Sequence, residues 1–202
     1  MKKSKIKLII FDAYGVCLTG GYSTTCKFLA KKFRKNWKEI YNIVYTKYFN
    51  QAALKKISQD DAWLKAIKEL NLPININNFK KKHYDLMRVN KSVLSLASEL
   101  EKNYRILLLS KNTRSQLRDI NNRFPEIKKV FGKNIINTWE HNLPKASGET
   151  VEFVCERYHV KPQEIIYTDD QQSNLDVAHK MGIKTILYKN FRQFKKELND
   201  YL

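Results

Sequence analysis

The chain is poor in cysteine and in long apolar segments, and these absences narrow the classes of protein to which it can belong. It has three cysteines, Cys17, Cys26 and Cys155, and no Cys-x-x-Cys pair. This pattern argues against a disulfide-stapled secreted domain and against a structural zinc site, and it predicts a reduced, cytoplasmic location. No apolar run approaches the roughly 20 residues that a membrane-spanning helix needs.

Other signatures are missing as well. The apolar run near the start is too short, and is interrupted too soon by Asp12, for a secretory signal. The sequence contains no glycine-rich dinucleotide fingerprint, no Walker-type phosphate loop, no internal repeat and no low-complexity tract. These absences favour an ordinary globular protein, and 202 residues are enough for one core with a small cap.

Acidic residues are scarce relative to basic ones. The chain has 38 Lys and Arg against 20 Asp and Glu, which gives a formal net charge of +18 at pH 7. A nucleic-acid partner, bound through its phosphates, is one interpretation. We favour compositional bias as the cause of this charge, because 30 of the basic residues are Lys and only 8 are Arg. Arg is the residue that suits bidentate contacts with nucleic acid. The positive field would in either case steer a small anionic substrate toward the protein.

Short apolar runs alternate with amphipathic segments along most of the chain. The runs that we interpret as strands cover residues 6–11, 105–109, 134–137, 164–168 and 184–187. From residue 91 onward, helical periodicity occupies residues 93–102, 114–124, 149–158, 171–180 and 191–198. This alternation predicts an α/β fold, with a Rossmann-like parallel sheet covered by helices on both faces.

The stretch between the first two predicted strands is interpreted as almost wholly helical. Large apolar residues recur at helical spacing in four segments, residues 22–33, 37–48, 58–70 and 79–87. We therefore expect an all-helical cap over residues 18–90, inserted into a core made of residues 1–17 and 91–202. Gly20 and Gly21 would act as hinges for motion of this cap.

Polar residues stand at the carboxyl ends of three of the predicted strands. Asp12 ends the first strand, Ser110 and Lys111 follow the second, and Asp169 with Asp170 follows the fourth. Because parallel strands point the same way, these side chains are expected to converge at one edge of the sheet. Three carboxylates in one place repel one another unless a divalent cation neutralises them, and oxygen ligands favour Mg²⁺.

This pattern resembles the haloacid dehalogenase-like hydrolase superfamily over nearly the whole chain. Asp12 matches the family's nucleophile, Ser110 its second motif, Lys145 its third, and Asp169–Asp170 with Asn174 its fourth. No single motif is specific, but four motifs in the right order are a strong signal. The resemblance implies a hydrolase whose helical cap interrupts the chain just after the first motif.

The resemblance also implies a mechanism. The chain would be a Mg²⁺-dependent phosphohydrolase that acts on a small phosphorylated metabolite through an aspartyl-phosphate intermediate. The ligands expected for Mg²⁺ are Asp12, the backbone carbonyl of Tyr14, Asp169 and Asp170. The residues expected to act in catalysis are Asp12, Ser110 and Lys145, and those expected to bind substrate are Ser110, Lys111 and Lys145.

Tyr14 departs from the family's usual pattern. Most phosphatases of the superfamily carry a second Asp at this acid/base position, two residues after the nucleophile. General acid–base catalysis by that Asp contributes a factor of roughly 10²–10⁴ to the reaction rate. Tyrosine, with a reference pKa of about 10, is a poor base near neutral pH. Three outcomes stay open: a substrate with a good leaving group, a proton supplied by another residue, or slow or absent phosphatase activity.

Two other functions stay open. Residues 12–15, Asp-Ala-Tyr-Gly, are similar to the first motif of the L-2-haloacid dehalogenases, in which the Asp attacks carbon without a metal. Those enzymes have a hydroxyl pair in place of Asp169 and Asp170, and an Asn in place of Lys111. We rank phosphoryl chemistry first, because adjacent acids would repel a haloacid carboxylate. A catalytically impaired binding or regulatory protein is the third interpretation.

Overall fold

The computed structural model describes residues 6–202 and divides the chain into two compact units. The first, which we call the sheet unit, contains the chain up to Leu18, Val89–Lys111 and Asn121–Leu202. The second, the helical unit, contains Thr19–Arg88 and Asn112–Ile120. In the described part of the chain, no helix has both the length and the apolar character needed to cross a bilayer.

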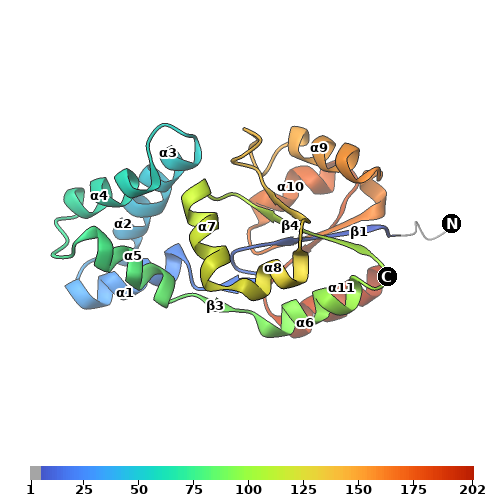
Figure 1. Cartoon of the computed structure of the whole chain (residues 1–202), viewed down its shortest axis with the longest axis horizontal. Coiled ribbons are helices and arrows are strands. Elements are labelled where there is room, and N and C mark those ends of the chain that lie inside the picture. The colour runs from blue at the N-terminus through green and yellow to red at the C-terminus, as the bar shows by residue number, and fades with distance from the viewer. Residues whose placement is uncertain (1–5) are drawn as a thin grey trace. The chain divides into compact units, whose positions relative to one another are not determined.

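A parallel five-stranded sheet forms the centre of the sheet unit (Figure 1). Its strands, in spatial order, are β5 (Ile135–Asn137), β4 (Arg105–Ser110), β1 (Leu8–Asp12), β6 (Ile165–Asp169) and β7 (Lys184–Leu187). All five residues of β1 are buried, as expected for a strand that is covered on both faces. The predicted parallel α/β sheet is therefore confirmed, and each predicted strand matches an observed one within two residues at either end.

Helices of the sheet unit cover both faces of the sheet. In Figure 1, α9 (Gly148–Tyr158) and α10 (Gln172–Lys180) lie above the sheet, and α6 (Lys91–Leu100), α8 (Pro125–Phe131) and α11 (Phe191–Tyr201) lie below it. Helix α8 was not among the predicted helices. Pro125 stands in its first turn, where the missing N–H of proline costs no hydrogen bond, and this was the signal for a new helix.

Successive residues of β1 point to opposite faces of the sheet. Ile10 joins a buried apolar cluster with α9 and α10. Phe11, on the other face, packs edge-on against Phe131 of α8 and Phe194 of α11. Each fully buried side chain of this size stabilises the fold by about 1.5–3 kcal/mol. The same alternation directs Asp12 to the face that carries α9 and α10.

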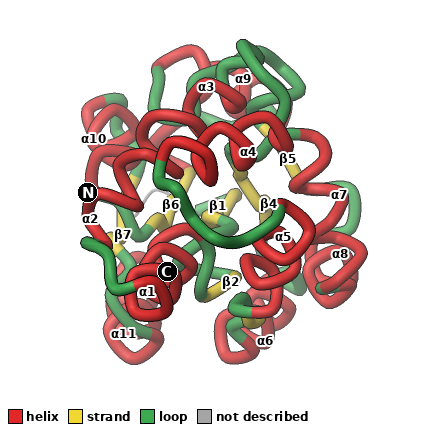
Figure 2. Tube along the Cα trace, turned by 90° about the vertical axis from the view of Figure 1, so that its left-hand side faces the viewer, coloured by secondary structure: helices red, strands yellow, loops and turns green. Residues whose placement is uncertain are grey.

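The helical unit is built from consecutive helices, drawn red in Figure 2. They are α1 (Tyr22–Phe33), α2 (Trp37–Tyr41), the π-helical η1 (Asn42–Phe49), α3 (Asn50–Ala53), α4 (Gln59–Glu69) and α5 (Ile76–Asp85). All four predicted helical segments are present, and the second continues through η1 into α3. Ser58 caps α4, because its hydroxyl accepts the Asp61 backbone N–H at 3.0 Å.

Residues 112–120, which the expected core boundaries include, group instead with the helical unit. They contain most of α7 (Arg114–Arg123), and one buried and one partly exposed polar contact link them to the helical unit. Gln116 Nε2 lies 3.3 Å from Tyr22 Oη, and Asp119 forms a 3.0 Å ion pair with Lys80. The interpretation of residues 18–90 as a mobile cap stays a prediction.

A short two-stranded sheet forms where the chain leaves the sheet unit and where it returns. Its strands are β2 (Leu18–Thr19) and β3 (Arg88–Val89), neither of which was predicted. Gly20 follows β2 with φ +98°, and a Cβ on it would lie 2.5 Å from the Leu86 carbonyl oxygen. The structure thus gives a steric reason for a glycine at this position, and its role as a hinge stays a prediction.

Candidate active site

The pairing of residues between neighbouring strands fixes how far each candidate residue extends at the carboxyl edge of the sheet. Asp12 lies opposite Leu109 of β4, so Ser110 reaches one residue beyond the level of Asp12. On the other side of β1, β6 runs in parallel and ends at Asp169, level with Asp12. Asp12, Ser110 and Asp169 are all buried.

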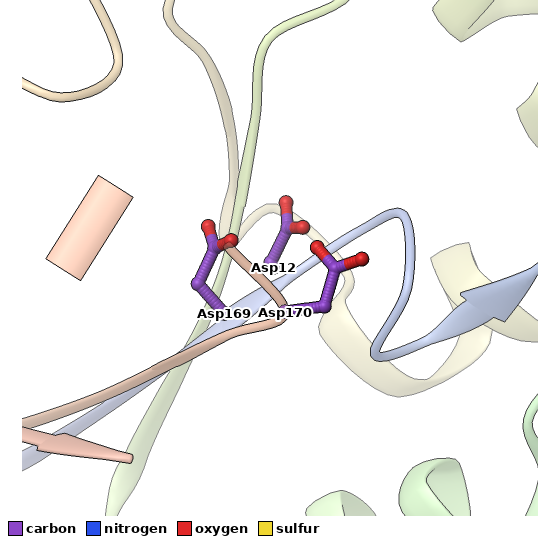
Figure 3. Close-up of side chains that lie close together, drawn as sticks. All are labelled: Asp12, Asp169 and Asp170. Carbon is purple, nitrogen blue, oxygen red and sulfur yellow. The ribbon is translucent and has the colours of Figure 1, made fainter. Parts of the chain in front are cut away.

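Three carboxylates gather at this edge (Figure 3). Asp12, Asp169 and Asp170 each offer an oxygen, and these oxygens all lie within 4.8 Å of one another. Asp12 comes from the end of β1, and the other two come from the end of β6 and the residue after it. Asp12 and Asp169 are buried, whereas Asp170 is exposed. This donor set suits a hard divalent cation such as Mg²⁺.

Lys145 links two of these carboxylates. Its Nζ donates to Asp12 Oδ1 and, at 2.7 Å, to Asp169 Oδ2. The side chain is only 6% exposed, so both ion pairs are shielded from water. The preceding residue is anchored to α9, because the Thr150 hydroxyl donates to the Pro144 carbonyl at 2.7 Å. Helix α9 thereby fixes the backbone from which Lys145 reaches the site.

Asp169 is held by a dense set of donors. The Tyr167 hydroxyl donates to Oδ2 at 2.8 Å, the Gln171 backbone N–H donates to Oδ1 at 2.9 Å, and Asn174 Nδ2 lies 3.0 and 3.1 Å from the two oxygens. With Lys145 added, both oxygens of Asp169 are engaged. By contrast, the Ala13 N–H and Lys145 both donate to Oδ1 of Asp12, and no group within residues 6–202 donates to its Oδ2.

Gly15 makes room for Asp170. It has φ +87°, and a Cβ built on it would lie 2.1 Å from Asp170 Cγ, a distance that no real contact allows. The turn after β1 and the turn after β6 therefore approach each other through the one residue type that has no side chain. A larger residue at position 15 would push the Asp170 carboxylate away from Asp12.

The site holds more negative than positive charge around Asp12. Burial, followed by the neighbouring Asp169 and Asp170 charges, raises the pKa of Asp12 to about 8, although Lys145 opposes the shift. Although Asp170 is exposed, partial shielding of its carboxylate from water, followed by the Asp169 charge, also raises its pKa. For Lys145, burial lowers the pKa, but the Asp12, Tyr167 and Asp169 charges outweigh it and raise the pKa well above its usual value. A divalent cation would relieve the repulsion among the carboxylates, so the residues fit a metal.

The remaining predicted residues lie near the same edge. Ser110 is the last residue of β4, and its backbone carbonyl accepts the Thr138 N–H at 2.9 Å. Lys111 follows it and is partly buried, and burial and the Lys145 charge lower its pKa. Tyr14 lies in the turn after β1, which the Gly15 N–H closes by donating to the Leu18 carbonyl at 2.7 Å. The Tyr14 carbonyl as a metal ligand stays a prediction.

Two residues of the site were not predicted from the sequence. Tyr167 lies two residues before Asp169 on the same strand, so strand alternation could have placed its hydroxyl beside that carboxylate. Gly15 had no comparable signal, since its role depends on the approach of Asp170 from a different strand.

A family model for haloacid dehalogenase-like hydrolases matches residues 20–188. The chain belongs to this family. The matched range of this hydrolase includes Ser110, Lys145 and the Asp169–Asp170 pair, and Asp12 precedes it. A search of curated proteins found no match to the chain.

Solved structures share the fold of this hydrolase. A HAD family enzyme from Bacteroides thetaiotaomicron, in complex with magnesium and inorganic phosphate, is 19% identical with a TM-score of 0.72, over 91% of this chain and 94% of that one. A predicted HAD-like family hydrolase from Porphyromonas gingivalis is 15% identical with a TM-score of 0.74, over 96% of this chain and 97% of that one. L-2-haloacid dehalogenase from Xanthobacter autotrophicus, with chloropropionic acid covalently bound, is 14% identical with a TM-score of 0.66. The match covers 96% of this chain and 83% of that one. These similarities show the fold and leave both reaction types open.

Proposed function

We propose that this hydrolase is a Mg²⁺-dependent phosphohydrolase that acts on a small phosphorylated metabolite in the cytoplasm. The observation that carries the proposal is the cluster of Asp12, Asp169 and Asp170, whose oxygens lie within 4.8 Å of one another. Such a cluster disfavours an anionic substrate unless a cation is present, and a bound Mg²⁺ would turn it into a site for phosphate. The free state of all three cysteines suits a reducing compartment.

Each residue of the site has a separate role in the proposed reaction. The Asp12 carboxylate attacks phosphorus, the bond from phosphorus to the ester oxygen breaks, and water then cleaves the aspartyl-phosphate. Lys145, which already contacts Asp12, orients that carboxylate and offsets charge on the transferred group. The Ser110 hydroxyl donates to a phosphoryl oxygen. Mg²⁺, held by Asp12, Asp169 and Asp170 with the Tyr14 carbonyl, would supply the positive charge that lets two anions approach.

Tyr14 limits this reaction at one step. The departing oxygen needs a proton, and the position that usually carries an Asp has a phenol instead. We therefore expect slow turnover of esters with a poor leaving group and faster turnover of esters whose leaving group needs no proton. p-Nitrophenyl phosphate belongs to the second kind and is the first substrate to test.

Haloacid dehalogenation is the second candidate. The similarity in fold to an L-2-haloacid dehalogenase and the tyrosine two residues after Asp12 favour it. In that reaction Asp12 would attack carbon and halide would leave without help from a metal. The dense donor set on Asp169 would then serve only to hold Lys145 and the nucleophile in place.

One experiment separates the candidates. Phosphate release from p-nitrophenyl phosphate and a panel of phosphorylated metabolites is measured with Mg²⁺ and with EDTA, beside chloride release from 2-chloropropionate. The proposal predicts Mg²⁺-dependent phosphate release that Asp12→Asn abolishes and that Asp200→Asn, an exposed control, leaves unchanged. Chloride release in EDTA would favour the dehalogenase. Release of neither product would favour a catalytically impaired binding protein.

A further inference from the structure

Lys111 carries a positive charge that no side chain among residues 6–202 pairs with. It directly follows Ser110 and is partly buried. Within residues 6–202, its ammonium group donates no hydrogen bond and forms no ion pair. The other lysine of the site, Lys145, is in contact with Asp12 and Asp169. Partial burial of an unpaired ammonium is costly, and a bound anion would remove that cost.

The two lysines also repel each other. Burial, followed by the Lys145 charge, lowers the pKa of Lys111, because a second positive charge disfavours the protonated form. Lys145 cannot turn away to relieve this repulsion, because its two carboxylate partners hold it. An anion that binds Lys111 would therefore gain from both positive charges.

Lys111 lies beyond the end of β4, past the positions of Asp12 and Ser110 at the carboxyl edge of the sheet. Asp12 pairs with Leu109, Ser110 comes next, and Lys111 is the second residue beyond that level. Each residue adds up to about 3.3 Å along a parallel strand. Lys111 directly follows the end of β4, so the chain reaches it after passing the level of the nucleophile and Ser110. A substrate whose phosphoryl group lies at Asp12 and Ser110 would bring the rest of its structure toward this side of the site.

We propose that Lys111 binds a carboxylate of the substrate, so that the preferred substrates are phosphate esters with a carboxylate close to the phosphoryl group. The inference rests on the proposed phosphohydrolase function and names the class of its substrate. The charges match, because one ammonium balances one carboxylate. The transferred phosphoryl group already has Ser110, Lys145 and the metal for its oxygens, and this leaves Lys111 for a different group.

The test uses two phosphonates that cannot be hydrolysed and that differ in one group. Phosphonoacetate carries a carboxylate beside the phosphonate, and ethylphosphonate carries a methyl group there. Their affinities in saturating Mg²⁺ are measured by titration calorimetry for the wild type and for Lys111→Gln. Comparison of the two proteins cancels the chelation of Mg²⁺ in solution, because that chelation is the same for both.

We expect the wild type to bind phosphonoacetate at least about tenfold more tightly than ethylphosphonate, as a charge-assisted hydrogen bond would provide. Lys111→Gln should lose this preference and should bind ethylphosphonate within about twofold of the wild type. Lys111→Arg, which keeps the charge, should retain the preference. So should Lys102→Gln, an exposed lysine of the same unit that controls for net charge.

Two results would overturn the inference. One is an equal loss of affinity for both phosphonates in Lys111→Gln, which would assign Lys111 to the phosphoryl group itself. The other is a wild type that does not prefer phosphonoacetate, including one that binds neither ligand. The outcome is distinguishable from that of the proposed function: a protein that shows the preference but releases no phosphate keeps the contact of Lys111 with a carboxylate, and loses the phosphohydrolase together with its substrate class.

Discussion

Lys145 Nζ lies 2.7 Å from Asp169 Oδ2, and the same ammonium also contacts Asp12. In a site that is almost closed to water, this one cation is the direct partner of two carboxylates. The stability of the sheet unit therefore depends on groups that the proposed reaction also uses.

Replacement of Lys145 by Met should lower the free energy of unfolding by about 3–5 kcal/mol in the absence of Mg²⁺, because it leaves two buried carboxylates without a counter-charge. Urea unfolding measures the change. Lys7→Met is the matched control, since Lys7 forms a 2.6 Å ion pair with Glu164 at the surface and should cost less than about 1 kcal/mol. Similar losses for the two variants would contradict the prediction.

Gly15→Ala should weaken Mg²⁺ binding by about tenfold or more, because a Cβ there would displace the Asp170 carboxylate. The readout is the rise in melting temperature with millimolar Mg²⁺, which reports a ligand that binds only the folded protein. Gly132→Ala controls for backbone strain, since Gly132 also has a positive φ, +54°, but has nothing within 4 Å of its Cβ position. If Gly15→Ala responds to Mg²⁺ as the wild type does, the prediction that Asp170 is a metal ligand is wrong.

Tyr14→Asp should raise phosphatase turnover roughly ten- to hundredfold on esters with a poor leaving group, because it restores an acid/base group at the expected position. The gain should be small on p-nitrophenyl phosphate, whose leaving group needs no proton. Steady-state phosphate release on both kinds of ester measures the difference. Tyr14→Asn provides no titratable group and should give no gain. An unchanged or lower rate in Tyr14→Asp would show that more than the acid/base group is missing.

His83 should make the folded protein sensitive to acid. It is fully buried in the helical unit beside the Thr25 hydroxyl, 2.9 Å away, and burial lowers its pKa from 6.5 to about 3. Between these values the unfolded chain binds a proton at this residue and the folded chain does not. The contribution of His83 to the free energy of unfolding is therefore fully present above pH 6.5 and is lost as the pH falls toward 3.

The expected loss from this residue is about 2 kcal/mol between pH 7 and pH 5. Urea unfolding over this range measures it as the difference between the wild type and His83→Gln, which has no titratable group. His141→Gln, at an exposed histidine, should keep the pH dependence of the wild type. Equal slopes for the wild type and His83→Gln would mean that His83 takes up a proton without unfolding.

Much of the fold followed from local patterns in the chain. The apolar run that ends at Asp12 and the run that ends at Ser110 predicted β1 and β4, because a strand covered on both faces must be apolar along its length. Helix α8 was missed although the helix predicted over residues 114–124 ended just before it, because its seven residues are too few for apolar periodicity to indicate a helix. The order of the four motifs also indicated the family.

The sequence by itself determined which residues end the strands, because burial and periodicity act over a few neighbouring positions. Only the tertiary structure decided that Lys145 bonds to Asp12, which is 133 residues away, and that Asp170 occupies the space beside Gly15. It also decided that Gln116 packs with the helical unit rather than with the sheet that precedes it. Such contacts depend on strand order, register and the close approach of separate turns. No local stretch of sequence encodes them, because the free energy that selects them comes from groups brought together only when the whole chain folds.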